Sequence, residues 1–455
     1  MARRSTMLSR RGLLTGAAAI GGAAAIGGAA ALSGGLSACG AAGATGAADQ
    51  IQFWTPLSGG DGGTMAEMVT KATQGAAYDV KTTTLVWGEP YYTKLAMAAT
   101  GGRPPELAIM HASRMPGYAP GGLLDSWDVG RLAELGVSED DFPAEIWKKG
   151  LSGDKLFAVA LDAHPTVLMF NPEICDKAGV LDSDGKLLPT ESPEAFIDLI
   201  SQVGGQTKDT PPLSYGYLGD GAQMFRIFYT FYTQHGAAMT FPEGGKAEID
   251  DDIAIESLQL MQTLLDGKLA VQRNDYAAAL AEFATGRSGL LFTGVWELRS
   301  VKEAGVPFDM TAIPTLFGTP TTYADSHAFV LPHQNDPDEH RRDLTYRFVA
   351  DLLKGSYDWA TAGHVPAYLP VTQSPDYAKL TPQSHYADVA EQVVYDPEAW
   401  FTGSASNFQS NFGNAVQPAL MSGKDAPGAI DAFRARVDRL LTTRNPVDPD
   451  GTWKP

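Results

Sequence analysis

Cys39 and Cys175 are the only two thiols in this chain of 455 residues, and only Cys39 lies where a reaction of the thiol is expected. It ends the segment Leu-Ser-Ala-Cys at 36–39, after a long uncharged run of Ala, Gly, Leu and Ile. A charged start, an apolar stretch and small residues before a processing point are typical of a secretory signal. Because the segment has the form of a bacterial lipobox, residues 1–38 are predicted to be a signal peptide and Cys39 to carry a lipid anchor.

The apolar run follows a pair of arginines, Arg10 and Arg11. This pair predicts export by the twin-arginine route, with the general secretory route as the alternative. A transmembrane helix is disfavoured, because Ala and Gly contribute little transfer free energy compared with Leu or Ile. We therefore expect a folded body that is exported and lipid-anchored to the outer face of the cell membrane.

The other motifs that could support chemistry lack either the residue spacing or the partner residues that the chemistry requires. Cys175 lies on a predicted apolar helix face, and no His or Asn can be assigned as its catalytic partner. Residues 182–185 begin like a calcium loop, but their Gly is fourth rather than sixth, which indicates a turn instead. The loop at 58–63 lacks the Gly-Lys-Ser/Thr of a phosphate-binding loop. The sequence therefore predicts no catalytic residue, no metal and no cofactor.

The composition limits the possible partners. Residues 1–38 contain four arginines and no acid, so the mature chain has 30 basic and 53 acidic residues and a formal charge of −23. Such a charge disfavours nucleic acid and anionic lipid headgroups as partners, since both select clusters of Lys and Arg. No later segment reaches the roughly 18 apolar residues that a membrane span requires. The simplest layout is one anchor and one folded body of one large or two medium domains.

The elements that must position any site alternate between strand and helix along the mature chain. Hydrophobic patterns with a period near two residues predict strands, and patterns with a period near 3.6 predict helices. This order indicates an α/β fold whose ligand loops follow the strands. The predicted strands are 51–54, 80–86, 106–110, 156–161, 288–292 and 328–331, and the predicted helices are 64–73, 91–99, 193–203, 224–233, 253–265, 341–353, 412–421 and 426–441.

Several short motifs occur in a characteristic order. Phe-Trp at 53–54 precedes a Gly-rich loop, and Tyr-Tyr-Thr-Lys-Leu at 91–95 is followed by Gly-Gly-Arg-Pro-Pro-Glu-Leu at 101–107, with Glu in place of the usual Asp. His-Ala-Ser-Arg at 111–114 and a Gly-x-Trp turn within 292–297 come after them. In this order the chain resembles, over nearly its whole mature length, the extracellular solute-binding proteins of ABC sugar importers, the family that includes maltose-binding protein.

The resemblance implies a two-lobed, periplasmic-binding-protein-like α/β fold. Each lobe would be a mostly parallel sheet flanked by helices, with the ligand cleft between the lobes. Carried onto this sequence, lobe one is 50–161 with 309–362, and lobe two is 162–308 with 363–455, after a flexible tether at 39–49. The lobes would close around the ligand by a hinge motion.

Aromatic side chains are expected in the cleft, because a sugar presents apolar C–H faces that stack on flat rings. Trp296 is the first candidate, since Gly294 allows a turn that pushes the indole into the cleft. Trp54 lies at a strand end, and Trp400 with Phe401 lies where the family brings late aromatic residues to the sugar. For each of them a place in the hydrophobic core is the alternative.

Polar candidates are expected beside these rings. Asp162 matches a ligand-binding carboxylate position of the family, and a carboxylate accepts charge-assisted hydrogen bonds from sugar hydroxyls. Ser113 and Arg114 lie in the loop after the third strand, although the family pattern has an acid at the position of Ser113. Asp61 either binds ligand or caps the helix that follows it. Four further candidates lie in predicted cleft loops: His111, His164, Tyr323 and His327.

The resemblance implies a substrate-binding lipoprotein that captures a mono- or oligosaccharide and delivers it to the permease subunits of an ABC transporter. It would be a monomer without catalytic activity. The nearest alternative keeps the fold but binds a polyol or a glycerol phosphodiester, with Arg114 and either Arg226 or Arg299 on the phosphate. A more distant alternative is a secreted glycoside hydrolase, which needs two carboxyl groups roughly 5–9.5 Å apart. The carboxylates available for that chemistry are Asp162, Asp61 and Glu297.

Overall fold

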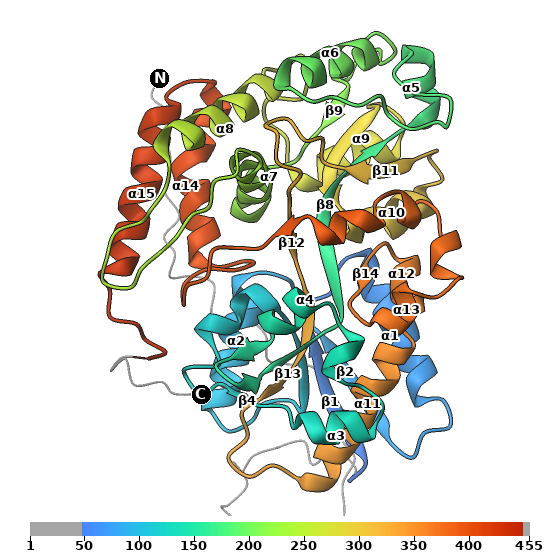
Figure 1. Ribbon diagram of the computed structural model, residues 1–455, viewed down its shortest axis with the longest axis vertical. Coiled ribbons are helices and arrows are strands. Elements are labelled where there is room, and N and C mark those ends of the chain that lie inside the picture. Colours follow the sequence, from blue (N-terminus) through green and yellow to red (C-terminus); the bar gives the residue numbers. More distant parts are fainter. Residues whose placement is uncertain (1–47, 449–455) are drawn as a thin grey trace, which may run out of the picture. The chain divides into compact units, whose positions relative to one another are not determined.

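The described residues, 48–448 of a computed structural model, alternate strands and helices around two β-sheets (Figure 1). The α/β class predicted from the sequence is therefore confirmed. Within 48–448, no helix combines the length and the apolar character that a membrane crossing requires. The predicted signal peptide and Cys39 lie outside the described residues, as does most of the tether.

The first sheet forms around β1, which runs parallel to both of its neighbours, β2 and β3. β13 joins it from late in the sequence and is antiparallel to β3. Its strands are β2 (Asp79–Thr84), β1 (Gln50–Thr55), β3 (Leu107–His111), β13 (His327–Pro332), β4 (Leu124–Asp125) and, beside β13, β7 (Ala158–Ala160). The helices that contribute to its core include α1 (Gly60–Thr73), α2 (Glu89–Thr100), α11 (Glu339–Lys354) and α12 (Tyr357–Thr361).

The second sheet is organised by β8 (Asp162–Phe170), whose nine residues are all buried. β8 is antiparallel to four shorter strands, so the sheets are mixed rather than mostly parallel as the sequence predicts. The other strands are β15 (Val393–Val394), β12 (Thr322–Asp325), β10 (Leu290–Gly294), β9 (Leu213–Ser214), β11 (Asp309–Ala312) and β14 (Val365–Pro366). Helices α6 (Pro193–Gly204), α7 (Gly221–Gln234), α8 (Asp251–Leu264), α14 (Asn407–Ser422) and α15 (Ala426–Leu441) supply most of its core.

Helix α7 is buried around nearly its whole circumference, between α8, α14 and β12. A helix that is apolar on every side is expected to lie in the interior, and α7 carries Phe, Tyr, Ile and Met on all faces. Asp220 caps its first turn and accepts a hydrogen bond from the backbone N–H of Gln223 at 3.0 Å. This fixed start brings the polar side chains of Gln223 and Arg226 to a cavity rather than to solvent.

The chain passes between the two sheets at three places, namely 161–162, 325–327 and 363–366. The second of these differs from the sequence prediction, which returns the chain to lobe one at residue 309. Instead β11 and β12, within 309–325, pair with β8 in the second sheet. The physical reason is the length of β8, which offers backbone pairing to several short strands along its two edges.

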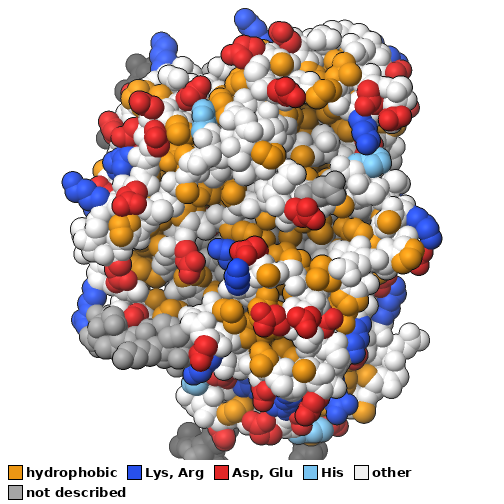
Figure 2. Space-filling model, viewed as in Figure 1, with side chains coloured by type: hydrophobic (Ala, Val, Ile, Leu, Met, Phe, Trp, Pro, Cys, Tyr) orange, Lys and Arg blue, Asp and Glu red, His pale blue; other side chains and the backbone are white. Residues whose placement is uncertain are grey.

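Acidic side chains are spread over the face of the molecule in Figure 2, with basic side chains between them singly or in small groups. This distribution agrees with the excess of Asp and Glu in the sequence.

Candidate functional site

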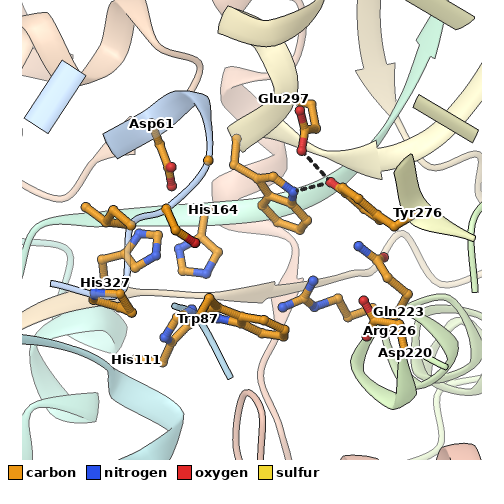
Figure 3. Close-up of a pocket in the computed structure, with 15 residues that line it drawn as sticks. Asp61, Trp87, His111, His164, Asp220, Gln223, Arg226, Tyr276, Glu297 and His327 are labelled. Atoms are coloured by element: carbon orange, nitrogen blue, oxygen red, sulfur yellow. Dashed lines mark hydrogen bonds between the residues drawn. The ribbon is translucent and has the colours of Figure 1, made fainter. Parts of the chain in front are cut away.

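A cavity of about 240 Å³ lies between the two sheets and receives side chains from both (Figure 3). The loop before α1 and the ends of β3 and β13 contribute from the first sheet, while β8, α7, α9 (Tyr276–Ala284) and the turn after β10 contribute from the second. Its lining is therefore assembled from segments far apart in the sequence. The lining residues are Pro56, Leu57, Ser58, Gly59, Asp61, Trp87, His111, His164, Asp220, Gln223, Arg226, Tyr276, Trp296, Glu297 and His327.

Trp296 lines the cavity, held by a turn that depends on a glycine. A Cβ atom on Gly294 would come within 2.0 Å of the indole ring, so no other residue fits there without moving Trp296. The indole N–H donates to the Tyr276 hydroxyl at 2.7 Å, and that hydroxyl donates to a Glu297 carboxylate oxygen at 2.7 Å (Figure 3). The Gly-x-Trp turn of the sequence therefore presents a fixed aromatic face to the cavity.

Two carboxyl groups on the cavity wall differ in their environments. Glu297 is buried, and this burial raises the pKa of its carboxyl group. Asp61 lies in the first turn of α1, where its negative charge also suits the helix dipole. Both accept hydrogen bonds when ionised, which is the chemistry that recognises hydroxyl groups.

Arg226 extends from α7 into the middle of the cavity (Figure 3). Its guanidinium carbon lies 4.8 Å from the ring centre of Trp296 and 5.7 Å from that of Trp87. Only 5% of Arg226 is exposed, and its Nε atom has no hydrogen-bond partner among residues 48–448. No carboxylate of the described chain lies within ion-pair distance of this side chain. The Nε donor of Arg226 is therefore available to a ligand.

Three histidines form the wall opposite, on the ends of β3, β8 and β13. The ring centres of His164 and His327 are 4.0 Å apart and stacked, and His111 lies 5.3 and 4.7 Å from them. Burial lowers the pKa of His111 and lowers that of His164 to about 3. Burial also acts on the pKa of His327, but the carboxylate of Asp162 outweighs it and raises that pKa. The wall therefore combines neutral imidazoles with one that gains a proton more readily.

Asp162, a predicted ligand contact, lies behind this wall and is fully buried. Its carboxylate is 3.0 Å from His164 Nδ1 and 2.9 Å from His327 Nδ1. It also accepts from the Trp359 indole N–H at 2.7 Å and from the backbone N–H of His327 at 2.8 Å. Asp162 thus positions the cavity histidines and does not itself face the cavity, which corrects its predicted role.

The remaining predicted site residues also lie outside this cavity. Ser113 donates a hydrogen bond to the buried Asp325 carboxylate, and Tyr323 donates to that of Asp396, so both serve buried networks. The others contact other parts of the protein instead of the cavity. Arg114 lies over Tyr92 and Tyr118, Trp54 lies beside Lys94 in a separate groove, and Trp400 and Phe401 pack against the core of the second sheet.

Hydrogen bonds from Arg299 join the two sides beside the cavity. Arg299 in α10 (Leu298–Ala304), which packs on the second sheet, donates to the Thr64 hydroxyl of α1 at 2.9 Å. The same guanidinium donates to Glu67 of α1 at 3.1 Å. A Cβ atom on Gly60 would come within 2.8 Å of the Ser300 hydroxyl, which shows how closely α1 and α10 approach.

Comparison with known proteins gives a consistent result. Residues 64–381 match the family model described as bacterial extracellular solute-binding protein. The GacH receptor of Streptomyces glaucescens, described unliganded and in complex with acarbose and an acarbose homolog, superimposes with a TM-score of 0.70 at 16% identity, covering 86% of this chain and 98% of that one. The cyclic alpha-maltosyl-1,6-maltose binding protein of Arthrobacter globiformis gives 0.65 at 17% identity, covering 86% and 99%. No curated protein matches.

Proposed function

Since the chain belongs to the bacterial extracellular solute-binding proteins, we propose that it captures a carbohydrate in the cavity between its two sheets. Proteins of this family bind solutes outside the cytoplasm and are not enzymes, so a glycoside hydrolase is not proposed. The bound sugar would be passed to the membrane permease of an ABC importer. The two structures superimposed above, described with acarbose or named for a cyclic maltosyl-maltose, support a carbohydrate ligand.

The observation that carries this proposal is the pairing of indole faces with polar groups in one cavity. Trp296 and Trp87 offer flat apolar surfaces to the C–H face of a sugar, and Gln223, Asp61 and Glu297 offer hydrogen bonds to its hydroxyl groups. A volume of about 240 Å³ is below the usual range of roughly 300–1,000 Å³ for ligand pockets. A monosaccharide or a short oligosaccharide is therefore the preferred ligand class, and a longer one requires the lobes to open.

A second ligand class is favoured by the available Nε donor of Arg226. A buried guanidinium without a carboxylate partner is a strong binding group for phosphate, because its planar fork matches two oxygen atoms. A glycerol phosphodiester would place its phosphate on Arg226 and its hydroxyl groups on the same polar wall. Of the arginines considered from the sequence, Arg226 alone lines the cavity within the described chain.

A thermal-shift panel of neutral sugars and glycerol phosphodiesters separates the two classes. A ligand that binds only the folded state at 100 times its Kd stabilises the protein by about 2.7 kcal/mol. We expect neutral sugars to raise the melting temperature, and Arg226→Met to retain most of that effect. If the phosphodiester is the ligand, its shift disappears in Arg226→Met but persists in the control Arg287→Met, an exposed residue outside the cavity. A panel without any sugar-induced shift contradicts the first proposal.

The lipid anchor is proposed from the lipobox at 36–39. We expect Cys39→Ala to leave the protein unprocessed or released into the medium, because the lipobox then has no thiol for lipid attachment. Cell fractionation with detection of the attached lipid measures this result. Cys175→Ala is the matched control, since Cys175 is buried in the core and should not affect attachment. Membrane attachment of a correctly cleaved Cys39→Ala protein would exclude this cysteine as the anchor.

A further inference from the structure

Asp162, His164, His327 and His364 form a buried cluster, and only two of its members, His164 and His327, line the cavity. One ligand atom from each of them lies within 4.8 Å of the others. We propose that these four residues bind one divalent transition-metal ion, with zinc as the preferred ion. This inference goes beyond carbohydrate capture, because three imidazoles and one carboxylate are a donor set for zinc-like ions rather than for sugars.

The distances suit a single ion with four ligands. The Asp162 carboxylate oxygens lie 3.0 Å from His164 Nδ1, 2.9 Å from His327 Nδ1 and 2.9 Å from His364 Nδ1. Zinc bonds of about 2.0–2.1 Å place tetrahedral ligand atoms about 3.3 Å apart. The carboxylate–imidazole distances are close to this value, and binding of an ion would draw together those ligand atoms that are up to 4.8 Å apart.

Unpartnered nitrogens in the cluster give a second, independent reason. His364 is fully buried; its Nδ1 lies 2.9 Å from the Asp162 carboxylate but without hydrogen-bond geometry, and its Nε2 has no hydrogen-bond partner within the described part of the chain. His164 Nε2 is buried and unpartnered in the same way. Leaving buried polar atoms without partners is unfavourable. Coordination of an ion would satisfy a nitrogen of His364 that the protein itself leaves without a partner.

The surroundings supply the outer contacts that a metal site needs. The Asp162 carboxylate accepts from the Trp359 indole N–H and from the backbone N–H of His327, which fixes its orientation. The Trp359 ring stacks on His364 with centres 4.1 Å apart. His164 and His327 also line the ligand cavity, which gives an ion a route into the cluster.

The position of the cluster indicates what the ion would do. Asp162 and His164 begin β8, His327 begins β13, and His364 directly precedes β14. These are the three places where the chain passes between the sheets. A single ion bound there would tie all three crossings together and restrict the hinge, so metal content would set how freely the cavity opens.

Metal binding is tested on the purified protein after removal of metals with EDTA. We expect one Co²⁺ ion per chain, with the intense visible absorption of tetrahedral cobalt, and displacement of that ion by Zn²⁺. His364→Gln should weaken zinc binding by at least about 100-fold, since loss of even an outer partner weakens metal binding by about 10- to 100-fold. His340→Ala is the control, because His340 is exposed, pairs with Asp49 and is not a member of the cluster.

The outcomes are distinct. Tetrahedral cobalt absorption in the unaltered protein that disappears in His364→Gln supports the site. Tetrahedral cobalt absorption that persists in His364→Gln overturns the proposal. So does the absence of both cobalt absorption and a zinc-induced rise in melting temperature, and the cluster is then held together by hydrogen bonds alone. If His364→Gln does not fold, the absorption spectrum of the unaltered protein decides alone. Sugar binding is measured separately with metal-free protein, so failure of the metal proposal leaves the carbohydrate proposal standing, and the reverse.

Discussion

Asp162→Ala should lower the free energy of unfolding by about 3–5 kcal/mol, the range expected when one partner of a buried charged network is removed. The substitution leaves the Trp359 N–H, the backbone N–H of His327 and two imidazoles without their common acceptor, around a carboxylate that is itself fully buried. Urea unfolding of ligand-free protein in EDTA measures the effect without any contribution from bound metal.

Asp61→Ala is the matched control for Asp162→Ala. Asp61 is a carboxylate of the cavity wall rather than of the buried network, so its loss should change the free energy of unfolding by less than about 1 kcal/mol, as for typical sites outside a buried network. Equal stability of the two variants would show that Asp162 is not the structural acceptor described here.

Trp296→Ala should weaken binding of the captured sugar by about 2–4 kcal/mol, as for aromatic residues that carry most of an interface energy. This corresponds to a roughly 30- to 1,000-fold higher Kd, measured by titration calorimetry with a sugar found in the panel. Because Trp296 is only partly buried, the ligand-free variant should lose much less stability than the roughly 3–5 kcal/mol of a core Trp cut to Ala.

Two further variants define the effect of Trp296→Ala. Gly294→Ala should also weaken the sugar complex, since its Cβ atom would displace the indole. Trp54→Ala should leave the Kd unchanged, because Trp54 lies in a separate groove. Normal sugar binding by a Trp296→Ala protein that melts much earlier would identify Trp296 as a core residue.

Most of the fold could be predicted from the sequence, because hydrophobic periodicity reports which face of an element is buried. The predicted helix 426–441 agrees with α15 at both ends. The predicted turn at 182–185 lies between Leu181 and Leu187, which pair as an antiparallel β-bridge. The predicted helix 253–265 corresponds to α8, which begins at Asp251 with Asp250 as its cap. Short strands such as β9 and β14 carry too few residues for a periodic signal, so their pairing with longer strands was not predictable.

The site was predictable only where a residue lies at or near one end of a helix or strand that points to the cavity. Asp61, His111, His164, Trp296 and His327 meet this condition and line the cavity. Ligand binding by each of them stays a prediction.

The lining residues that sequence analysis missed come from elements whose roles depend on tertiary packing. Arg226, considered only for a phosphate ligand, sits within a buried aromatic helix whose inward face was not evident. The loop residue Trp87 and the helix-start residue Tyr276 have no local pattern that marks them. Conversely, the sequence positions of Ser113 and Tyr323 predict them in the site, but both donate hydrogen bonds to buried carboxylates outside the cavity.

The contact between Arg299 and α1 affects the rate at which a bound solute is released. Because this guanidinium joins helices from opposite sides of the cavity, a bound solute leaves only after those hydrogen bonds separate. An exposed pair of this kind contributes at most about 1 kcal/mol and weakens in salt. The time for which the solute stays bound would then shorten as ionic strength rises, while the rate of its capture by the open form changes little. An extracellular protein of this construction would release its cargo faster in a saline environment than in a dilute one.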